Sequence, residues 1–424
     1  MASGNTELSI DGILKEYYKD GAAVNTTYEK HPLWALLAKK EATPNVTGRQ
    51  FVHSVVFAGS SGQASGGNFA YAQTSGAATS MQSVQFLTNR YENIRDFGIA
   101  TEAVLSTRGD RGAFESIVTL ESDNALRNMA NTQEIFMFGT GTAAMSTVGS
   151  ISGNTVVLGN VTDGNKFEDG EELDAAASAS AGGLRAYGSG GHGLYIISVD
   201  RLNGVLTCGT TQAQNGTPCS PTDAVNGIPT LANGDSLFLR SYRNNVMQGL
   251  ESWIPFGAVS SSLFNGVNRT LDNVRLAGQS LDATQLSVED MVIQATTLVE
   301  LQSESLTHMI VPWGYFAKFQ KSGVAKEVIV QETEYDVSFS GISVMSPSGP
   351  ITVLPCRNCP ANRVYGLDIS SWEYTYMGKE PIFMWDLDGN MGLRQPNDDG
   401  IEYRFVSFGN LVCHRPSANI TVKV

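Results

Sequence analysis

The sequence is short of charge and of basic residues in particular. Only 17% of the 424 residues are charged, against about 25% in an average globular protein. Lys and Arg number 28 against 42 Asp and Glu, for a net charge of −14. This balance excludes a protein that grips nucleic acid through clustered basic side chains, although not one that merely lies near nucleic acid. We expect other subunits to cover much of the surface, because interfaces are depleted of charge.

Long apolar runs and a leader are also missing. No stretch approaches the roughly 18 to 20 apolar residues of a membrane span. The opening sequence MASGNTELSIDGILKEYYKDG has no basic segment followed by an apolar core, so it does not look like a secretory signal. The odd number of cysteines predicts free thiols and assembly in the cytoplasm. They are Cys208, Cys219, Cys356, Cys359 and Cys413.

The interval from Gln50 to Asn89 contains no Asp, Glu, Lys or Arg. Two strand-like runs, FVHSVVF and SVQFLTNRYENI, flank the small-residue stretch SSGQASGGNFAYAQTSGAATS. Alternation places one set of side chains on one face of each run, at Phe51, His53, Val55, Phe57, Val84, Phe86 and Thr88. We predict a hairpin with a very long tip, since compact domains rarely keep such loops without a purpose. A disordered surface loop is the alternative.

Helical periodicity marks the first third of the chain. Two short helices form an N-terminal arm, one carrying Ile10, Ile13, Leu14, Tyr17 and Tyr18 and the other written HPLWALLAKK, with Pro32 near its start. The strongest helix signal runs from about Ala113 to Phe138 and stops before Gly139 and Gly141. At 1.5 Å per residue, this helix would be roughly 39 Å long.

The remainder is mostly strand-like. Short apolar runs alternate with turn residues from Met145 to about Leu250, which predicts an all-β insertion. After Trp253, SVEDMVIQATTLVELQ opens with the capping-box residues Ser287 and Asp290, THMIVP predicts a strand, and PWGYFAKFQKSG predicts a short helix. Strands dominate from there to the C-terminus. The fold class is α+β, with one long helix and an all-β insertion.

The tetrapeptide GDSL matches the signature of a serine hydrolase family, which would make Ser236 a nucleophile. That chemistry needs a histidine preceded by Asp three residues earlier, and none of the five histidines has one. A turn at Asn233 and Gly234 that enters a strand is the simpler interpretation.

Three other motifs suggest sites that the sequence does not complete. CRNC holds Cys356 and Cys359, but Cys413 and His414 further on would point to opposite faces of a strand, so zinc binding stays undecided. DLDGNMG resembles half a calcium loop, with Met391 and Asn397 where Gly and Glu belong. GTGTAA follows a helix rather than a strand and is no dinucleotide fingerprint. No catalytic, cofactor or metal site is predicted.

The order of elements resembles a tailed-phage major capsid protein of the Hong Kong 97 type over nearly the whole chain. The stretches that carry the resemblance are FAYAQTSGAATSMQSVQFLTNRYENIRDFGIATEAV, ESDNALRNMANTQEIFMFGTGT, GLESWIP, VYGLDISSWEY and RFVSFGNLVCHRPSANITV. It implies an N-terminal arm (1–48), an extended hairpin (49–92), a peripheral domain with the spine helix (93–143 and 363–410) and an axial domain (251–362 and 411–424). Residues 144–250 would be the β-rich insertion.

The resemblance also implies a function. The chain would self-assemble into pentamers and hexamers of an icosahedral shell around double-stranded DNA. Scaffolding, portal and decoration proteins would be its partners, and it would be made in the host cytoplasm and reside in the virion. The hairpin would lie across a neighbouring subunit, anchored by Phe69, Tyr71 and Met81. Some members cross-link this hairpin through a lysine, but here no lysine occurs between Lys40 and Lys166.

Three other functions stay open at this point. The chain could be another β-rich virion component, such as a tail or decoration protein, although the long helix and the hairpin disfavour this. It could form the shell of a bacterial nanocompartment that encloses enzymes, because such shells belong to the same family. A serine hydrolase that uses Ser236 is the enzyme alternative, and the absence of a suitable histidine disfavours it.

Overall fold

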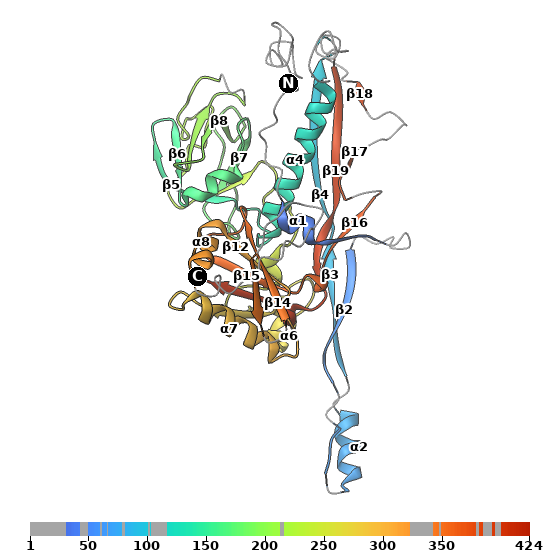
Figure 1. Cartoon of the computed structure of the whole chain (residues 1–424). Coiled ribbons are helices and arrows are strands. Elements are labelled where there is room, and N and C mark those ends of the chain that lie inside the picture. Colours follow the sequence, from blue (N-terminus) through green and yellow to red (C-terminus); the bar gives the residue numbers. More distant parts are fainter. Residues whose placement is uncertain are drawn as a thin grey trace.

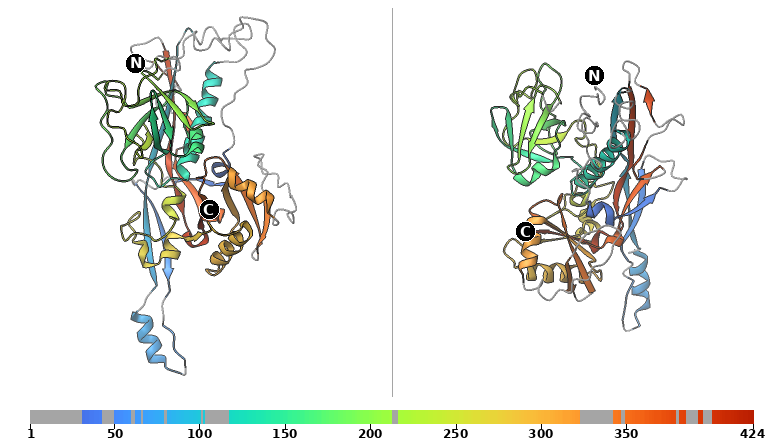
Figure 2. Two further views of the ribbon diagram at one scale, coloured as in Figure 1. Left: turned by 90° about the vertical axis from the view of Figure 1, so that its left-hand side faces the viewer. Right: turned by 45° about the horizontal axis from the view of Figure 1, so that its top comes forward.

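The computed structural model describes residues 31–42, 50–59, 62–65, 67–78, 81–100, 102, 117–212, 216–322, 342–346, 349–378, 381–384, 392–394 and 400–424. Four parts are visible in Figure 1: a long sheet flanked by a helix, a second sheet with its own helices, a small barrel to one side, and a hairpin that projects away from the other three. Figure 2 shows that the tip of the hairpin also stands clear of the body in two further views.

The long sheet is built around β19 (Gly400–Cys413). This strand pairs antiparallel with β4 (Tyr91–Ala100) along one edge and with β16 (Trp372–Met377) along the other. Two short strands, β17 (Phe383–Met384) and β18 (Leu393–Arg394), also pair with β19. Helix α4 (Ile117–Met137) packs on this sheet and buries Ala125 and Met129 against Phe405. The sheet and helix together form an elongated spine.

The second sheet has six strands in the order β11–β20–β15–β12–β14–β13. Their bounds are Gln279–Asp282, Ile420–Lys423, Arg363–Leu367, His308–Pro312, Gly349–Cys356 and Ile342–Ser346. Helices α7 (Val288–Glu300) and α8 (Trp313–Lys321) turn apolar residues such as Met291, Ala295 and Phe319 into its core. The sequence-based division places β15 in the peripheral domain, but this strand pairs with β12 and β20 inside the second sheet.

Six short strands close into a barrel in the order β10–β5–β6–β9–β8–β7. Their bounds are Ser236–Leu239, Ser146–Ser152, Thr155–Leu158, Val205–Gly209, Leu194–Asp200 and Glu172–Ala176. Buried side chains such as Val156, Leu173, Leu206 and Phe238 fill it. Closure removes the open edges that six short strands would otherwise present to water or to other chains.

The remaining helices are short. They are α1 (Pro32–Leu36), α2 (Phe69–Ala78), α5 (Leu250–Trp253) and α6 (Asn273–Ala277), and the 3-10 turns η2 (Val161–Lys166), η3 (Arg269–Leu271), η4 (Ile369–Ser371) and η5 (Pro416–Ala418). None of the helices in the described part of the chain is long and apolar enough to cross a membrane.

The segment HPLWALLAKK is helical only in its first half. Pro32 stands at the first position of α1, as predicted, and Leu33 is fully buried. The buried carboxylate of Glu134 on α4 accepts a hydrogen bond from the backbone amide of Leu33 at 3.0 Å, which fixes α1 to the spine. The prediction of a helix over the whole segment was wrong, because residues 38–41 form β1 (Ala38–Glu41), which adds in parallel to β16.

Two local predictions, the long helix and the cap at Ser287, are confirmed. The long helix is α4, which ends at Met137, one residue before the predicted end. Its predicted first residues, 113–116, lie outside the described part of the chain. Ser287 caps α7 by accepting a hydrogen bond from the amide of Asp290 at 3.1 Å. The predicted first arm helix, with Ile10 and Tyr17, also lies outside the described residues.

Candidate functional site

The hairpin consists of β2 (Gln50–Ala58) and β3 (Gln82–Asn89), which pair antiparallel as the sequence predicts. Phe51 lies opposite Thr88, His53 opposite Phe86, and Val55 opposite Val84. These are the residues that the alternation places on one face, and each of them is buried or half-buried. One face of the ribbon therefore packs on the body of the same chain.

The base of the hairpin is fixed to the body by aromatic contacts and by two hydrogen bonds. The ring of Phe86 lies 5.2 Å from that of Trp253 on α5. Arg275 of α6 donates from Nη1 to the carbonyl oxygen of Phe57 at 2.6 Å. The amide of Leu87 donates to the carbonyl of Asn265 at 2.8 Å. Both strands are thus held, and the ribbon leaves the body in a fixed direction.

His53 lies at the centre of this attachment. Its ring stacks on Trp253 at 6.0 Å between centroids and lies 4.9 Å from the ring of His414. Burial, and to a smaller extent His414, lowers the pKa of His53 to about 4. His414 in turn donates from Nε2 to Glu373 at 3.1 Å, and this hydrogen bond lowers the pKa of Glu373. His53 is therefore uncharged at neutral pH and behaves as part of an aromatic cluster.

The other face of the ribbon is left exposed by the described residues of the chain. Val52 and Val56 on β2 are each 57% exposed, and Leu87 on β3 is also exposed. The two-stranded ribbon is covered by the body on one face only. Such a ribbon is stable in water only when something covers its apolar side.

The tip of the hairpin forms a helix, which the sequence analysis did not predict. Helix α2 spans Phe69–Ala78, and Asn68 caps it by accepting a hydrogen bond from the amide of Tyr71 at 3.2 Å. Phe69 is 84% exposed and Tyr71 61% exposed, and Met81 beyond the helix is exposed as well. An isolated helix of this length is marginal in water. The apolar anchors named from the sequence are thus left exposed by the part of the chain that the structure describes.

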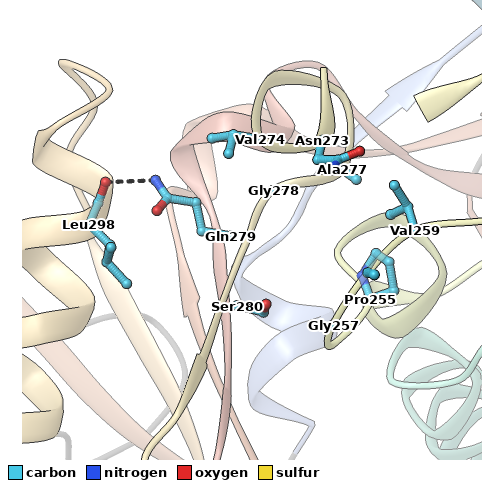
Figure 3. A pocket seen from close by; sticks show the side chains of 11 residues that line it. Pro255, Gly257, Val259, Asn273, Val274, Ala277, Gly278, Gln279, Ser280 and Leu298 are labelled. Carbon is cyan, nitrogen blue, oxygen red and sulfur yellow. Dashed lines mark hydrogen bonds between the residues drawn. The ribbon is translucent and has the colours of Figure 1, made fainter. Parts of the chain in front are cut away.

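A pocket lies near the base of the hairpin, beside the edge strand β11. Figure 3 shows its lining, which comes from the loop after α5, from α6, from β11 and from the last turn of α7. Its cavity volume is about 360 Å³. The side-chain amide of Gln279 donates to the carbonyl of Leu298 at 2.7 Å and holds one wall in place. No pattern in the sequence predicts this pocket.

Ser236 of the GDSL motif lies in the wall of the barrel. It is the first residue of β10 and is 5% exposed, with β5 on one side and β7 on the other. The neighbouring carboxylate of Asp235 accepts two hydrogen bonds from Arg185, at 2.7 and 2.9 Å. Gly234 before it has φ of +88°, so the predicted turn into a strand is present. Among the described residues, no histidine forms a hydrogen bond with Ser236.

The thiols of CRNC are buried in the core at the end of β14. Burial raises the pKa of Cys356 and of Cys359 well above the ordinary thiol value, which disfavours the thiolate that zinc requires. Within the described ranges, no group of three or more His, Cys, Asp or Glu side chains is placed to hold a metal ion. The DLDGNMG stretch at 386–392 lies almost entirely outside the described residues.

Neither a family model nor a curated protein matches this sequence. A solved structure of the cyanophage A-1(L) capsid asymmetric unit is similar, with a TM-score of 0.51 and 9% identity over 96% of this chain and 96% of that chain. A structure from Mycobacterium phage Ogopogo (TM-score 0.45, 10% identity, 99% of both chains) and one of the holo-SrpI encapsulin complex from Synechococcus elongatus PCC 7942 (TM-score 0.45, 7% identity, 99% of this chain and 95% of that chain) are more distant. The likeness to the cyanophage capsid chain extends over nearly the whole length of both proteins, and this chain therefore has the fold of a phage capsid protein.

Proposed function

We propose that this chain is the major capsid protein of a tailed phage, which self-assembles into pentamers and hexamers of an icosahedral shell around double-stranded DNA. The observation that carries the proposal is the hairpin. It leaves the body in a fixed direction, with Val52, Val56 and Leu87 exposed on one face and with Phe69 and Tyr71 exposed on the helix at its tip. Such an exposed element does not stabilise a monomer, whereas a subunit can use it to bind its neighbour.

A second copy of the chain fits the hairpin better than an unrelated partner. The hairpin and the surfaces that it would cover lie at different places on one chain, so the contact would be head-to-tail, and it would form a ring where the rotation between subunits closes. No residue from Gln50 to Asn89 is charged. Such a surface suits permanent burial between subunits, where charged groups are costly.

We propose the following division of labour within the shell. The arm (1–48), hairpin (49–92) and β-rich insertion (144–250) keep the bounds expected from the sequence. The spine would be the peripheral domain (93–143 and 368–410), and the second sheet would be the axial domain (251–367 and 411–424). The boundary is moved from 363 to 368 because β15 pairs with β12 and β20.

The net charge supports a container for DNA rather than a DNA-binding protein. With a charge of −14, the shell would repel packaged DNA rather than adhere to it. Scaffolding and portal proteins, and decoration proteins, would be further partners. Assembly in the host cytoplasm, with free thiols, agrees with the five cysteines, all of which are free. We propose no enzymatic role, because Ser236 is held in the barrel wall.

Expression of the chain alone, or with its scaffolding protein, tests this proposal. Negative-stain microscopy and sedimentation should reveal closed shells of uniform size. Monomers that never assemble at any concentration, with or without a scaffolding protein, would contradict the proposal. Tubes would point to a tail component. Shells that hold a co-purified enzyme rather than DNA, when isolated from the native source, would point to a nanocompartment.

A further inference from the structure

Two of the five cysteines lie opposite each other in the wall of the barrel. Gly209, the last residue of β9, forms an isolated antiparallel bridge with Pro218. The register of that bridge places Cys208 opposite Cys219, and the amide of Cys219 donates to the carbonyl of Cys208 at 3.0 Å. Opposite residues of an antiparallel pair carry their side chains on the same face. The two thiols therefore lie on one face of the barrel wall.

The spacing of such a pair suits a disulfide bond. Residues that lie opposite each other at a hydrogen-bonded position have Cα atoms about 5.5 Å apart. A disulfide bond joins Cα atoms roughly 4.4 to 6.8 Å apart. Burial, and to a smaller extent the neighbouring Cys219, raises the pKa of Cys208 to about 12, which agrees with two thiols close together. Both are free thiols in this structure.

The segment that carries Cys219 extends one edge of the barrel. Strand β6 pairs with β9 only as far as Thr155, which lies opposite Thr207. Strand β8 occupies the other edge of β9, where Tyr195 lies opposite Gly209. The segment with Cys219 therefore continues the β6 edge beyond the point where β6 pairs. A covalent bond to Cys208 would fix this segment to the barrel wall.

The two thiols differ in their access to solvent. Cys208 is 1% exposed, whereas Cys219 is only partly buried. A dissolved oxidant can therefore reach the sulfur of Cys219 first. The sulfur of Cys208 can then react from within the barrel, as the partner that completes the bond.

The other three cysteines lack this combination. Cys356, Cys359 and Cys413 are all buried. In their sheets, Cys413 lies opposite Trp372 and Cys356 lies beside Pro312. Cys359 lies in the turn after β14. Among the cysteines, only the barrel pair combines opposed backbone positions with one sulfur open to solvent.

We propose that Cys208 and Cys219 form an intramolecular disulfide bond when the protein leaves a reducing compartment, with a low-molecular-weight disulfide such as oxidised glutathione as the oxidant. The sulfur of Cys219 loses its proton, attacks that disulfide and releases one small thiol. The sulfur of Cys208 then loses its proton, attacks the sulfur of Cys219 and releases the second small thiol. Two protons and two electrons thus pass from the protein to the oxidant.

The pairing itself depends only on the barrel, whereas its timing rests on the proposed shell function. Thiols stay reduced in the cytoplasm, where the chain would be made, and disulfides persist outside the cell. A virion released from its host would therefore acquire the bond after assembly. The bond lies within one subunit, so it adds no link between subunits.

Oxidation of the purified full-length protein tests the pair. The reduced protein is incubated overnight with oxidised glutathione without denaturant, because burial leaves little reactive thiolate at Cys208. Remaining thiols are then alkylated in denaturant, and the chain is digested with trypsin. No Lys or Arg lies between Arg201 and Arg240, so both cysteines fall in one peptide, 202–240. That peptide should lose two hydrogen atoms and should take up alkylating agent only after reduction.

Two variants make the assignment specific. Cys219→Ser should leave Cys208 as a free thiol that is fully alkylated. Cys359→Ala is the matched control, because it removes a buried thiol elsewhere and should oxidise like wild type. Oxidation should also slow hydrogen exchange at the amide of residue 219 in wild type and in Cys359→Ala, but not in Cys219→Ser.

Several results would overturn the pairing. Full alkylation of both cysteines after oxidation would show that the two sulfurs do not meet in the folded chain. A glutathione adduct that persists on Cys219, or a dimer on a non-reducing gel, would have the same consequence. Loss of the oxidised peptide in Cys359→Ala would assign the oxidation to another pair. Because these measurements do not require assembled particles, failure of the pair leaves the shell function standing, and failure of assembly leaves the pair standing.

Discussion

The imidazole of His53 and that of His414 lie 4.9 Å apart between ring centroids, and both ring nitrogens of His53 are buried without a hydrogen-bond partner among the described residues. His53 belongs to the hairpin, whereas His414 follows the last residue of β19. The pair therefore joins the projecting ribbon to the spine. Glu373 accepts from His414, and Lys40 lies 3.9 Å from Glu373. Arg275, Glu304 and Arg415 line the same cleft as His414.

We expect this junction to make the protein sensitive to acid. Burial and then His414 lower the pKa of His53 from 6.5 to about 4 in the folded chain. As the pH falls below 6.5, the unfolded chain binds this proton before the folded chain does, so the free energy of unfolding should decrease until about pH 4 and this contribution should then level off. His53→Phe should remove that pH dependence. Urea unfolding of both proteins between pH 6.5 and 4 measures it.

Two features separate His53 from other titrating groups. The hydrogen bond from His414 lowers the pKa of Glu373 below 4.5. The stabilising contribution of Glu373 is therefore lost only below about pH 4.5, whereas that of His53 starts to fall at about pH 6.5. His308 in the second sheet also has a pKa lowered by burial, but it lies outside the hairpin. Hydrogen exchange in β2 and β3, expressed relative to the intrinsic exchange rate at each pH, should speed up in acid for wild type and for His308→Phe, but not for His53→Phe. Equal acceleration in all three proteins would rule out the role of His53.

Ser236→Ala should leave assembly, stability and any background esterase signal unchanged. The hydroxyl is buried in the barrel wall, and no described histidine is bonded to it, so there is no base to activate it. Particle yield and hydrolysis of a short-chain ester are the two measurements. Turnover that wild type shows and the variant lacks would establish a catalytic role and contradict a purely structural protein.

Shells of this chain should contain no covalent bonds between subunits. The interval between Lys40 and Lys166 lacks lysine, so neither the hairpin nor α4 carries an amine that could attack a neighbouring side chain. Boiled and reduced particles should run as a single band near 45.4 kDa on a denaturing gel. A ladder of multimers in that gel would contradict the prediction.

The sequence alone predicted those helices and strands that are determined by residues within the same segment. The capping box at Ser287 and the apolar spacing after it were enough to place α7, and alternation was enough to place β2 and β3. Helix α2 was missed because Gly, Ser and Thr dominate its surroundings and no apolar face marks it. The available signal was Asn68 as a cap before a run that contains Ala70, Ala72, Ala77 and Ala78.

Contacts between distant segments could not be read in this way. Strand β1 pairs with β16, so that Ala38 lies beside Glu373. No local pattern in AKKE, the sequence of β1, predicts that neighbour. The aromatic cluster around His53 joins segments far apart in the chain, and the pocket beside β11 forms where several elements within residues 255–298 pack together. Their formation depends on tertiary packing, and periodicity says nothing about which faces will meet.

The double replacement Phe69→Ser and Tyr71→Ser should prevent shell formation without unfolding the subunit. Both side chains are exposed in the monomer, so their loss removes nothing from its core. Loss of a buried aromatic anchor at an interface costs about 2 to 4 kcal/mol, which weakens each contact by roughly 30-fold to 1,000-fold. Because every subunit repeats the contact, particles should fail to form or form late. Sedimentation measures assembly, and circular dichroism with thermal unfolding measures the fold.

Leu202→Ser is the matched control for the tip variant. Leu202 is 85% exposed, as much as Phe69, but it lies on the barrel rather than on the hairpin. It loses a comparable exposed apolar side chain, so it should assemble like wild type if the effect is specific to the tip. Normal particles from the Phe69 and Tyr71 variant would show that the hairpin tip is not part of the interface. A variant that loses its monomer spectrum and thermal midpoint would instead show that α2 supports the subunit's own fold.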